Sequence, residues 1–412
     1  MGLFPFVGNA IVGSAERGLS GGIGRPAANL PLVVNDLAGA MRGGICSTGM
    51  LLCAATESMK ALKIFSRIII SCAVLTNISG WTAEKLEIYV TNEKSGDVSL
   101  IDGASRTVTA TIPVGKRPRG IRISPDGKTL FVAVSGTPIS APPQLDAKGN
   151  PIFKKGKDDD DDDDKKADKS ADGIAVVDLA ERKVLKKIQV GSDPEQLAVS
   201  ADGKRLYVSN EDVGTASVVE IASGKVEHII PVSREPEGVG TTPDGKAFYV
   251  TCETEGEIYV VDAGTFKTIT HFNVGGRPRS VDFLPDGSKA YIPSESAGQM
   301  HMIDAVKHEL MKTTALPAGS RPMCVTVAPD GKKIYTGTGR GGMVCVLDAQ
   351  TLEVKNSIKV GARPWGIAIA PDGKYLYSAN GPSDDVSVVD LATEKELTRI
   401  KAGSSPWGIA IH

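Results

Sequence analysis

The chain has 412 residues, a formal net charge of −2 and 41% hydrophobic residues, with 46 glycines and 24 prolines. This length is sufficient for two or three domains, or for one large repeat fold with a substantial core. The balanced charge argues against a nucleic-acid-binding protein, which would carry a basic excess or a basic stripe. Charged residues make up 23% of the chain, which also argues against a largely disordered protein and against a membrane protein.

The first 83 residues differ in character from the rest of the chain. Residues 1–58 are glycine-rich without a helical or strand period, whereas after Met59 basic residues precede a mostly apolar run over 68–78 and small residues that end at Ala83. This is the pattern of a secretory signal peptide, and the run is about half the roughly 20 residues that a membrane-spanning helix needs. We interpret Met59 as the true start, 1–58 as a disordered leader translated from upstream sequence, and 59–83 as a signal peptide for export to the periplasm or the medium. A natural disordered extension ahead of an internal signal is the alternative for 1–58.

A turn signal recurs through the remainder of the chain. Six tripeptides end in Asp-Gly, and their aspartates are spaced by 76, 42, 42, 44 and 42 residues, at Asp126, Asp202, Asp244, Asp286, Asp330 and Asp372. A period of about 42 residues with short alternating strands is typical of β-propellers. An aspartate also recurs at the end of the third strand of six units, where we expect it to cap the following turn; these are Asp102, Asp178, Asp262, Asp304, Asp348 and Asp390.

Each repeat unit is expected to contain four strands, as in 367–370, 375–379, 386–389 and 397–400. A proline that opens the inner strand of a unit occurs seven times, at Pro118, Pro194, Pro236, Pro278, Pro322, Pro364 and Pro406. The repeat region begins with a second strand and ends with an inner strand over 407–411, so we expect the last strand to complete the first blade. The sequence therefore predicts an all-β fold over 84–412: a seven-bladed β-propeller of four-stranded antiparallel blades, closed by the C-terminal strand.

The long interval of 76 residues holds an insertion over 135–171, between the second and third strands of the second blade. It contains seven consecutive aspartates, 158–164, flanked by lysines. Calcium takes carboxylate ligands, but calcium loops space them around a turn glycine, which a homopolymer does not do. We expect a solvated, disordered Asp/Lys-rich loop.

Several short runs resemble a known family. Tyr89–Asn92 (Tyr-Val-Thr-Asn), together with the Pro-Asp-Gly turns, resembles the YVTN family of β-propeller repeats. More narrowly, 115–120, 210–212, 234–238 and 406–408 resemble the periplasmic propellers associated with PQQ-dependent catabolism. The resemblance implies export and a genetic association with quinoprotein dehydrogenases and their cytochromes, but not that the propeller itself binds the quinone. The sequence departs from the pattern in the Asp-rich insertion and where Cys252 and Thr338 replace the asparagine of the motif.

Two sets of residues are expected around one mouth of the central channel. In a four-stranded blade, the loop before the inner strand and the loop after the second strand lie on the same face. The first set follows the opening prolines; besides Met323, its charged and aromatic members are Arg119, Glu195, Glu237, Arg279, Trp365 and Trp407. The second set follows the second strands and includes Glu93, Glu211, Glu253 and Glu295. Polar groups that converge beside aromatic surface are typical of ligand and partner sites. The structural alternative is that the charged residues pair between blades and that the tryptophans fill the seam beside the closing strand.

The sequence favours no catalytic residue, no metal and no cofactor. None of the five histidines belongs to the rim sets, and neither a Cys-x-x-Cys-His motif nor zinc-ligand spacing nor a Gly-x-Ser-x-Gly elbow occurs. Only Cys252, Cys324 and Cys345 follow Ala83. Cys324 and Cys345 are expected two strand spacings of about 4.8 Å apart, beyond the roughly 7 Å that a disulfide allows, so we expect free thiols.

Our leading functional hypothesis is an exported, monomeric, non-catalytic propeller without a stable membrane anchor. It would bind a periplasmic protein partner, such as a quinoprotein dehydrogenase or a cytochrome, or a small ligand, and support quinoprotein-dependent oxidation. The alternatives are a lactonase-like hydrolase that uses Glu195 or Glu237 as general base, and a cell-surface interaction module. A hydrolase predicts carboxylates of raised pKa in an enclosed pocket, whereas partner binding predicts an open rim with an exposed Trp365 or Trp407.

Overall fold

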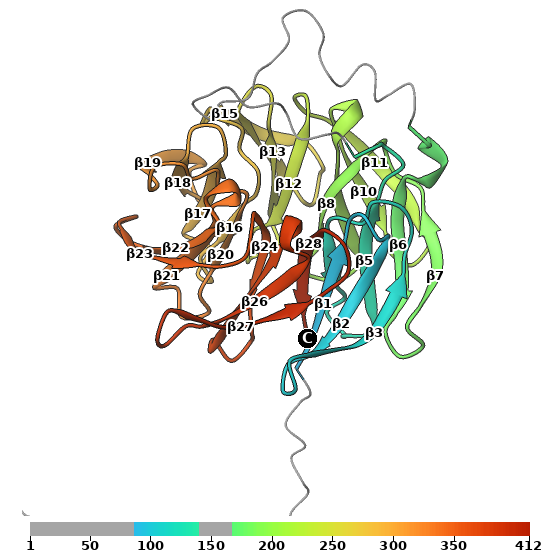
Figure 1. Cartoon of the computed structure of the whole chain (residues 1–412). Helices are drawn as coiled ribbons and strands as arrows, with labels where there is room; N and C mark the ends of the chain where they lie inside the picture. Colours follow the sequence, from blue (N-terminus) through green and yellow to red (C-terminus); the bar gives the residue numbers. More distant parts are fainter. Residues whose placement is uncertain (1–85, 140–166) are drawn as a thin grey trace, which may run out of the picture. The chain divides into compact units, whose positions relative to one another are not determined.

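Short strands of β-branched and aromatic residues, separated by Asp-Gly turns, build almost all of the structure. The computed structural model describes residues 86–139 and 167–412. Within them, twenty-eight strands form seven four-stranded antiparallel sheets arranged as the blades of a ring (Figure 1). The predicted seven-bladed β-propeller is therefore confirmed.

We number the blades in chain order and give their strands from the channel outward. Blade 1 comprises β28 (Pro406–Ile411), β1 (Glu87–Asn92), β2 (Asp97–Asp102) and β3 (Thr107–Pro113), and blade 2 comprises β4 (Ile121–Ile123), β5 (Thr129–Val134), β6 (Gly173–Asp178) and β7 (Lys183–Ile188). Blade 3 comprises β8 (Pro194–Val199), β9 (Arg205–Asn210), β10 (Thr215–Glu220) and β11 (Lys225–Pro231), and blade 4 comprises β12 (Pro236–Thr241), β13 (Ala247–Cys252), β14 (Glu257–Asp262) and β15 (Thr268–Asn273). Blade 5 comprises β16 (Asp282–Phe283), β17 (Lys289–Ser294), β18 (Gln299–Asp304) and β19 (Glu309–Ala315). Blade 6 comprises β20 (Cys324–Val327), β21 (Lys333–Gly337), β22 (Met343–Asp348) and β23 (Val354–Lys359). Blade 7 comprises β24 (Pro364–Ile369), β25 (Tyr375–Asn380), β26 (Asp385–Asp390) and β27 (Lys395–Lys401).

Four short 3-10 helices lie between second and third strands, on the face that the sequence assigned to the channel mouth. They are η1 (Lys169–Ala171) in blade 2, η2 (Glu211–Val213) in blade 3, η3 (Gly339–Gly341) in blade 6 and η4 (Gly381–Ser383) in blade 7. Each is a single turn, so these helices orient a few side chains and add no layer to the fold.

The hydrophobic core is divided into seven clusters, each enclosed between two neighbouring blades. Second-strand aromatics are central to them: Tyr207 of blade 3 stacks on Phe248 of blade 4 with ring centroids 4.0 Å apart. Full burial of each such side chain contributes about 1.5–3 kcal/mol. Because every cluster needs two blades, the stability of each blade depends on its neighbours.

The recurring third-strand aspartates cap turns, as predicted. Asp102 Oδ1 accepts a hydrogen bond from the backbone N–H of Ser105 at 2.7 Å, three residues later in the chain. The other five aspartates make the same contact. These residues lie on the opposite side of each blade from the channel mouth and have a local structural role.

The ring closes through the last strand, which is confirmed as the inner strand of blade 1. β28 pairs antiparallel with β1, with Ile411 opposite Ile88 and Ala410 opposite Tyr89 (Figure 1). Gly408 allows this strand to approach blade 2, because a Cβ there would lie 2.6 Å from the carbonyl oxygen of Arg119. Residues at both ends of the described chain thus complete one sheet.

The predicted leader (1–58), signal peptide (59–83) and aspartate run (158–164) lie outside the described residues. Parts of the predicted insertion that are described have defined positions: the Asp168 N–H donates to the Gly136 carbonyl oxygen at 3.0 Å, and η1 follows. In the described part of the chain, Cys252, Cys324 and Cys345 are free, as expected. No helix among the described residues is long and apolar enough to cross a membrane.

We expect Gly408→Ala to destabilise the ring, because the added methyl group must displace the backbone at Arg119. Overpacking of this kind costs about 1–3 kcal/mol. Thermal unfolding followed by circular dichroism measures the effect. Gly264→Ala is the matched control, since the nearest atom to its Cβ is 3.5 Å away; equal midpoints for the two variants would contradict the close approach.

Candidate binding site at the channel mouth

The backbone around each opening proline presents its neighbours to the channel mouth. The residue before the proline has a positive φ in six of the seven blades, namely Arg117, Asp193, Glu235, Arg277, Arg363 and Ser405, at 46° to 61°. Such a conformation is uncommon for residues other than glycine, and it is concentrated at functional sites. In blades 1, 3, 4 and 7 the register then shifts just after the proline. Such a β-bulge changes the direction of the side chain beside it, which is Trp407, Glu195, Glu237 and Trp365 in the respective blades.

Hydroxyl groups of the preceding blade hold two of the rim residues in place. Thr91 Oγ1 in β1 donates to the carbonyl oxygen of Arg119 at 2.8 Å and accepts from the N–H of Gly408 at 2.8 Å. Ser209 Oγ in β9 donates to the carbonyl oxygen of Glu237 at 2.6 Å. The backbone of the rim is therefore positioned by the blade next to it.

The predicted rim residues surround a hollow of about 490 Å³. Nine of the ten line it: Glu93, Arg119, Glu195, Glu211, Glu237, Arg279, Glu295, Trp365 and Trp407. The tenth, Glu253, is buried nearby and pairs with Arg277 and Arg279. A narrower hollow of about 80 Å³ lies between the inner strands and shares Glu237, Arg279 and both tryptophans with the larger one. The mouth thus continues into the channel.

One side of the mouth is an ion-pair cluster between blades 2 and 3. The Arg119 guanidinium, 2% exposed, pairs with Asp193 and Glu195 and lies 3.5 Å from Glu211 Oε2. Arg117 bonds Glu93 at 3.0 Å and lies 3.4 Å from Asp193. Arg119 therefore joins two blades through buried charges, which is the pairing between blades that the sequence analysis gave as the structural alternative to ligand binding.

A second cluster joins blades 4 and 5. Arg279 Nη1 lies 2.7 Å from Glu237 Oε1, pairs with Glu253 and lies 3.7 Å from Glu295. Arg277 also pairs with Glu253 and lies 3.9 Å from Glu295. The two clusters repeat one arrangement, with arginines from the residues before and after an opening proline.

Burial and like charges perturb the carboxylates of these clusters. Burial raises the pKa of Glu211 well above its ordinary value, and the nearby charges of Glu237 and Asp193 add to the rise. Burial also raises the pKa of Glu237, against the opposing effect of Arg279. For Asp193, the Arg119 and Arg117 guanidiniums outweigh burial and hold the pKa below its ordinary value. Neighbouring carboxylates thus differ in their tendency to be ionised.

The other side of the mouth is aromatic. Trp365 and Trp407 stack with ring centroids 6.1 Å apart and an interplanar angle of 29°. The Arg363 guanidinium lies over Trp365, 4.3 Å from the ring centroid, which is a cation–π contact. Arg340, from η3, also lines the hollow. Neither Arg340 nor Arg363 has a carboxylate partner among the described residues.

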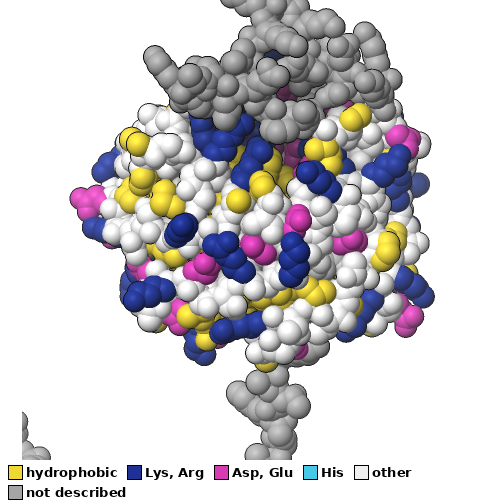
Figure 2. Space-filling model, viewed as in Figure 1, with side chains coloured by type: hydrophobic (Ala, Val, Ile, Leu, Met, Phe, Trp, Pro, Cys, Tyr) yellow, Lys and Arg dark blue, Asp and Glu magenta, His cyan; other side chains and the backbone are white. Residues whose placement is uncertain are grey.

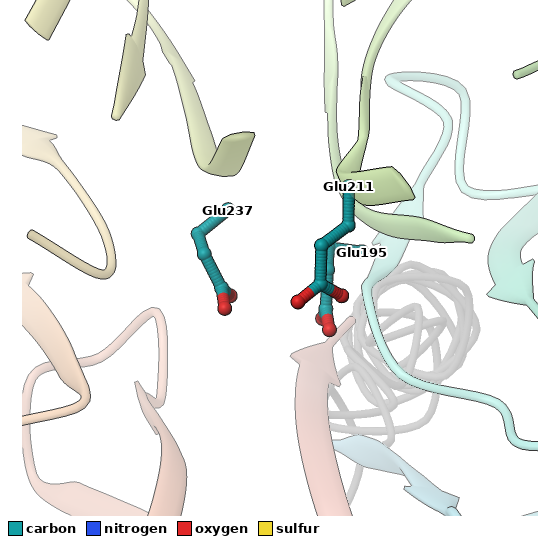
Figure 3. A group of neighbouring side chains, drawn as sticks. All are labelled: Glu195, Glu211 and Glu237. Atoms are coloured by element: carbon teal, nitrogen blue, oxygen red, sulfur yellow. The ribbon is translucent and has the colours of Figure 1, made fainter. Parts of the chain in front are cut away.

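Three glutamates from separate elements come together on the charged side. Glu195 follows the proline of β8, Glu211 begins η2 and Glu237 follows the proline of β12; carboxylate oxygens of all three lie within 4.8 Å of one another (Figure 3). The sequence places all three at the channel mouth but does not indicate them as metal ligands, for which only histidine, cysteine and the aspartate run were candidates. Their convergence depends on how blades 3 and 4 meet.

The sequence analysis also missed Arg117, Asp193, Arg277, Arg340 and Arg363. All but Arg340 immediately precede an opening proline, a position that is charged in six of the seven blades and polar in the seventh. That recurrence was visible in the sequence. Its importance was not, because the residue before a proline is ordinarily extended, whereas Arg117, Arg277 and Arg363 have a positive φ and line the hollow.

Comparisons with known proteins agree with the fold. No protein-family model matches the chain. Over 138 residues it is 32% identical to antigen Lp49 of Leptospira interrogans, a match that spans 30% of this chain and only 30% of that antigen.

Solved structures are similar over most of the chain. A chain of the Kuenenia stuttgartiensis hydrazine synthase matches with a TM-score of 0.61 at 19% identity, over 74% of this chain and 92% of that one. The periplasmic gluconolactonase of Pseudomonas aeruginosa matches with a TM-score of 0.60 at 19% identity, over 79% and 98%. A Lactobacillus plantarum protein matches with a TM-score of 0.63 at 17% identity, over 80% and 99%. At these identities the likeness shows the β-propeller fold alone.

We expect Arg119→Met to destabilise the protein by about 3–5 kcal/mol, because Asp193 and Glu195 would remain buried without their cation. Chemical denaturation measures the loss. Arg205→Met is the control, since its pair with Glu227 is about one-third exposed and exposed pairs contribute about 0–1 kcal/mol. Equal losses for both variants would contradict a dominant role for the buried cluster.

We expect Glu211→Gln to flatten the dependence of stability on pH. Because the pKa of Glu211 is raised in the folded state, its neutral form stabilises the fold below the ordinary value of 4.5, and this stabilisation is lost as pH rises through the raised pKa. The variant should therefore unfold at a higher temperature than the wild type at neutral pH, with a gap that closes toward pH 4. Thermal midpoints in buffer without divalent cations measure the gap. Glu309→Gln, on an exposed outer strand, should have the same thermal midpoints as the wild type. A gap between Glu211→Gln and the wild type that widens toward low pH would contradict a raised pKa of Glu211.

Proposed function

We propose that the channel mouth binds a small organic anion with a flat apolar face. The observation that carries this proposal is the placement of Arg340 and Arg363 in the lining of the hollow, without a carboxylate partner among the described residues. They lie beside the stacked Trp365 and Trp407. All the other arginines of the lining pair with carboxylates of the chain.

The electrostatics of Arg363 support an anionic ligand. Its pKa is lowered, first by burial and then by the positive charge of Arg340. A carboxylate placed between the two guanidiniums would relieve this repulsion, and guanidinium groups bind carboxylates through two parallel hydrogen bonds. The indole rings would contact the apolar part of the same ligand.

The shape of the mouth favours a small ligand over a protein partner. Trp407 is only 7% exposed and Trp365 is half-buried, so neither projects from the surface as an anchor for a partner would. The hollow of about 490 Å³ is within the range of small-molecule sites. On the face seen in Figure 2, basic and acidic side chains are interspersed.

Together with the resemblance to propellers of PQQ-dependent catabolism, this supports an exported, non-catalytic binding protein. Oxidation of alcohols and aldehydes by quinoprotein dehydrogenases ends in carboxylates, which are the class of anion that the two arginines suit. In this proposal the propeller holds a substrate or a product of that oxidation. Contact with the dehydrogenase or its cytochrome would use surfaces outside the hollow.

A lactone hydrolase is the second candidate. It is favoured by Glu237, which lines the hollow, is 3% exposed and has a raised pKa, as a general base requires. The fold likeness to a periplasmic gluconolactonase agrees with it. However, Glu237 Oε1 is bound by Arg279 at 2.7 Å, and this pairing reduces the capacity of the carboxylate to accept a proton.

We expect calorimetric titration to detect binding of benzoate or of pyrroloquinoline quinone, which both combine carboxylate with a flat ring. The double variant Arg340→Ala/Arg363→Ala should lower the affinity at least tenfold, since it removes both guanidiniums from the hollow. Arg321→Ala is the matched control, because Arg321 also precedes an opening proline but does not line the hollow. Unchanged affinity in the double variant, or no binding of either probe, would contradict the proposal.

The same samples distinguish the hydrolase. Glucono-1,5-lactone should open no faster with the protein than without it in a pH-stat. Turnover that Glu237→Gln abolishes would replace the binding function with a catalytic one.

A further inference from the structure

The three glutamates on the charged side of the mouth have the composition and spacing of a cation site. Glu195, Glu211 and Glu237 each present an oxygen to a shared space, with these atoms within 4.8 Å of one another (Figure 3). They reach it from β8, η2 and β12, and all three line the larger hollow, so an ion from solvent has access.

The arginines of the two ion-pair clusters do not neutralise the carboxylates with which they pair. Arg117, Arg119, Arg277 and Arg279 form ion pairs with seven carboxylates in total, namely Glu93, Asp193, Glu195, Glu211, Glu237, Glu253 and Glu295. With every carboxylate ionised, the two clusters therefore hold three negative charges in excess.

A second and independent observation concerns Glu195. Its side chain is 4% exposed, and Arg119 occupies only Oε1. The other oxygen, Oε2, is buried and has no hydrogen-bond partner. Buried polar atoms in native proteins nearly always have a partner, and this oxygen lies beside two further carboxylates, where a cation would supply one.

We propose that Glu195, Glu211 and Glu237 form a binding site for one calcium ion at the floor of the mouth. Three oxygens within 4.8 Å of one another all lie within about 2.8 Å of a common point, so a small closure of the side chains brings them to the roughly 2.3–2.6 Å that calcium adopts. Magnesium requires about 2.0–2.1 Å in near-octahedral geometry, so it would bind only if the side chains closed further. Calcium takes six to eight oxygens, and its remaining positions face the hollow, where water or a ligand oxygen can fill them.

The arginines and the ion have separate places in this site. Arg119 holds Glu195 Oε1 and Arg279 holds Glu237 Oε1, which leaves the second oxygen of each carboxylate for the ion.

Calorimetric titration of the EDTA-treated full chain with calcium chloride tests the proposal without any organic ligand. We expect one calcium per chain at this site, weaker binding of magnesium, and a higher thermal midpoint in calcium. Glu195→Gln and Glu211→Gln should each lower the calcium affinity at least tenfold, whereas Glu309→Gln on the exposed outer strand should leave it unchanged. Glu211→Gln decides the question if Glu195→Gln does not fold, because Glu211 is 24% exposed and lies 3.5 Å from Arg119.

The aspartate run 158–164 is a competing source of calcium binding. A variant with Asp158→Asn through Asp164→Asn should keep the site and its dependence on Glu211. Loss of all calcium binding in that variant, or full affinity in Glu211→Gln, would overturn the proposal. Absence of both heat and a thermal shift in the wild type would overturn it as well.

Discussion

The close approach of the inner strands around the channel is the constraint on which the rest of the structure depends. At Gly408, as at Gly120, a side chain would collide with the carbonyl oxygen of a rim residue of the next blade, at 2.6 Å from the added Cβ in both cases. With no side chain there, the backbones meet directly, and Gly120 donates its N–H to the Glu195 carbonyl oxygen at 3.0 Å. Because every blade shares its core with two neighbours, this spacing sets both the closure of the ring and the width of the mouth.

The same spacing creates the electrostatics of the mouth. Inner strands that lie so close bring the charged residues beside each opening proline within bonding distance of the next blade, as Arg119 of blade 2 meets Asp193 of blade 3. Buried charges must be paired, and the arginines pair most of them. The carboxylates outnumber those arginines on one side, while on the other side Arg340 and Arg363 have no carboxylate partner among the described residues. The mouth is therefore polarised, with one side suited to a cation and the other to an anion.

The fold could be predicted because its determinants are local and repeated. The Asp-Gly turns, the aromatic residue of each second strand and the opening prolines recur with the period of a blade. The final strand over 407–411 is an inner strand with no second strand after it, and β1 supplies that partner. Nine of the ten predicted rim residues line one hollow for the same reason, since each has a fixed place in its repeat. Four of the five residues that escaped prediction, Arg363 among them, have a left-handed backbone that composition does not indicate.

The sequence by itself determined the number of blades, the closure by the last strand and the face on which charged and aromatic residues gather, because each follows from spacing along the chain. Only the tertiary structure decided which charges meet, which stay without a partner and how deeply the tryptophans are buried. Those properties depend on distances between residues of different blades, such as the 4.8 Å that encloses the oxygens of Glu195, Glu211 and Glu237. They arise when the strands curve into a ring, and no periodicity of the chain encodes them residue by residue.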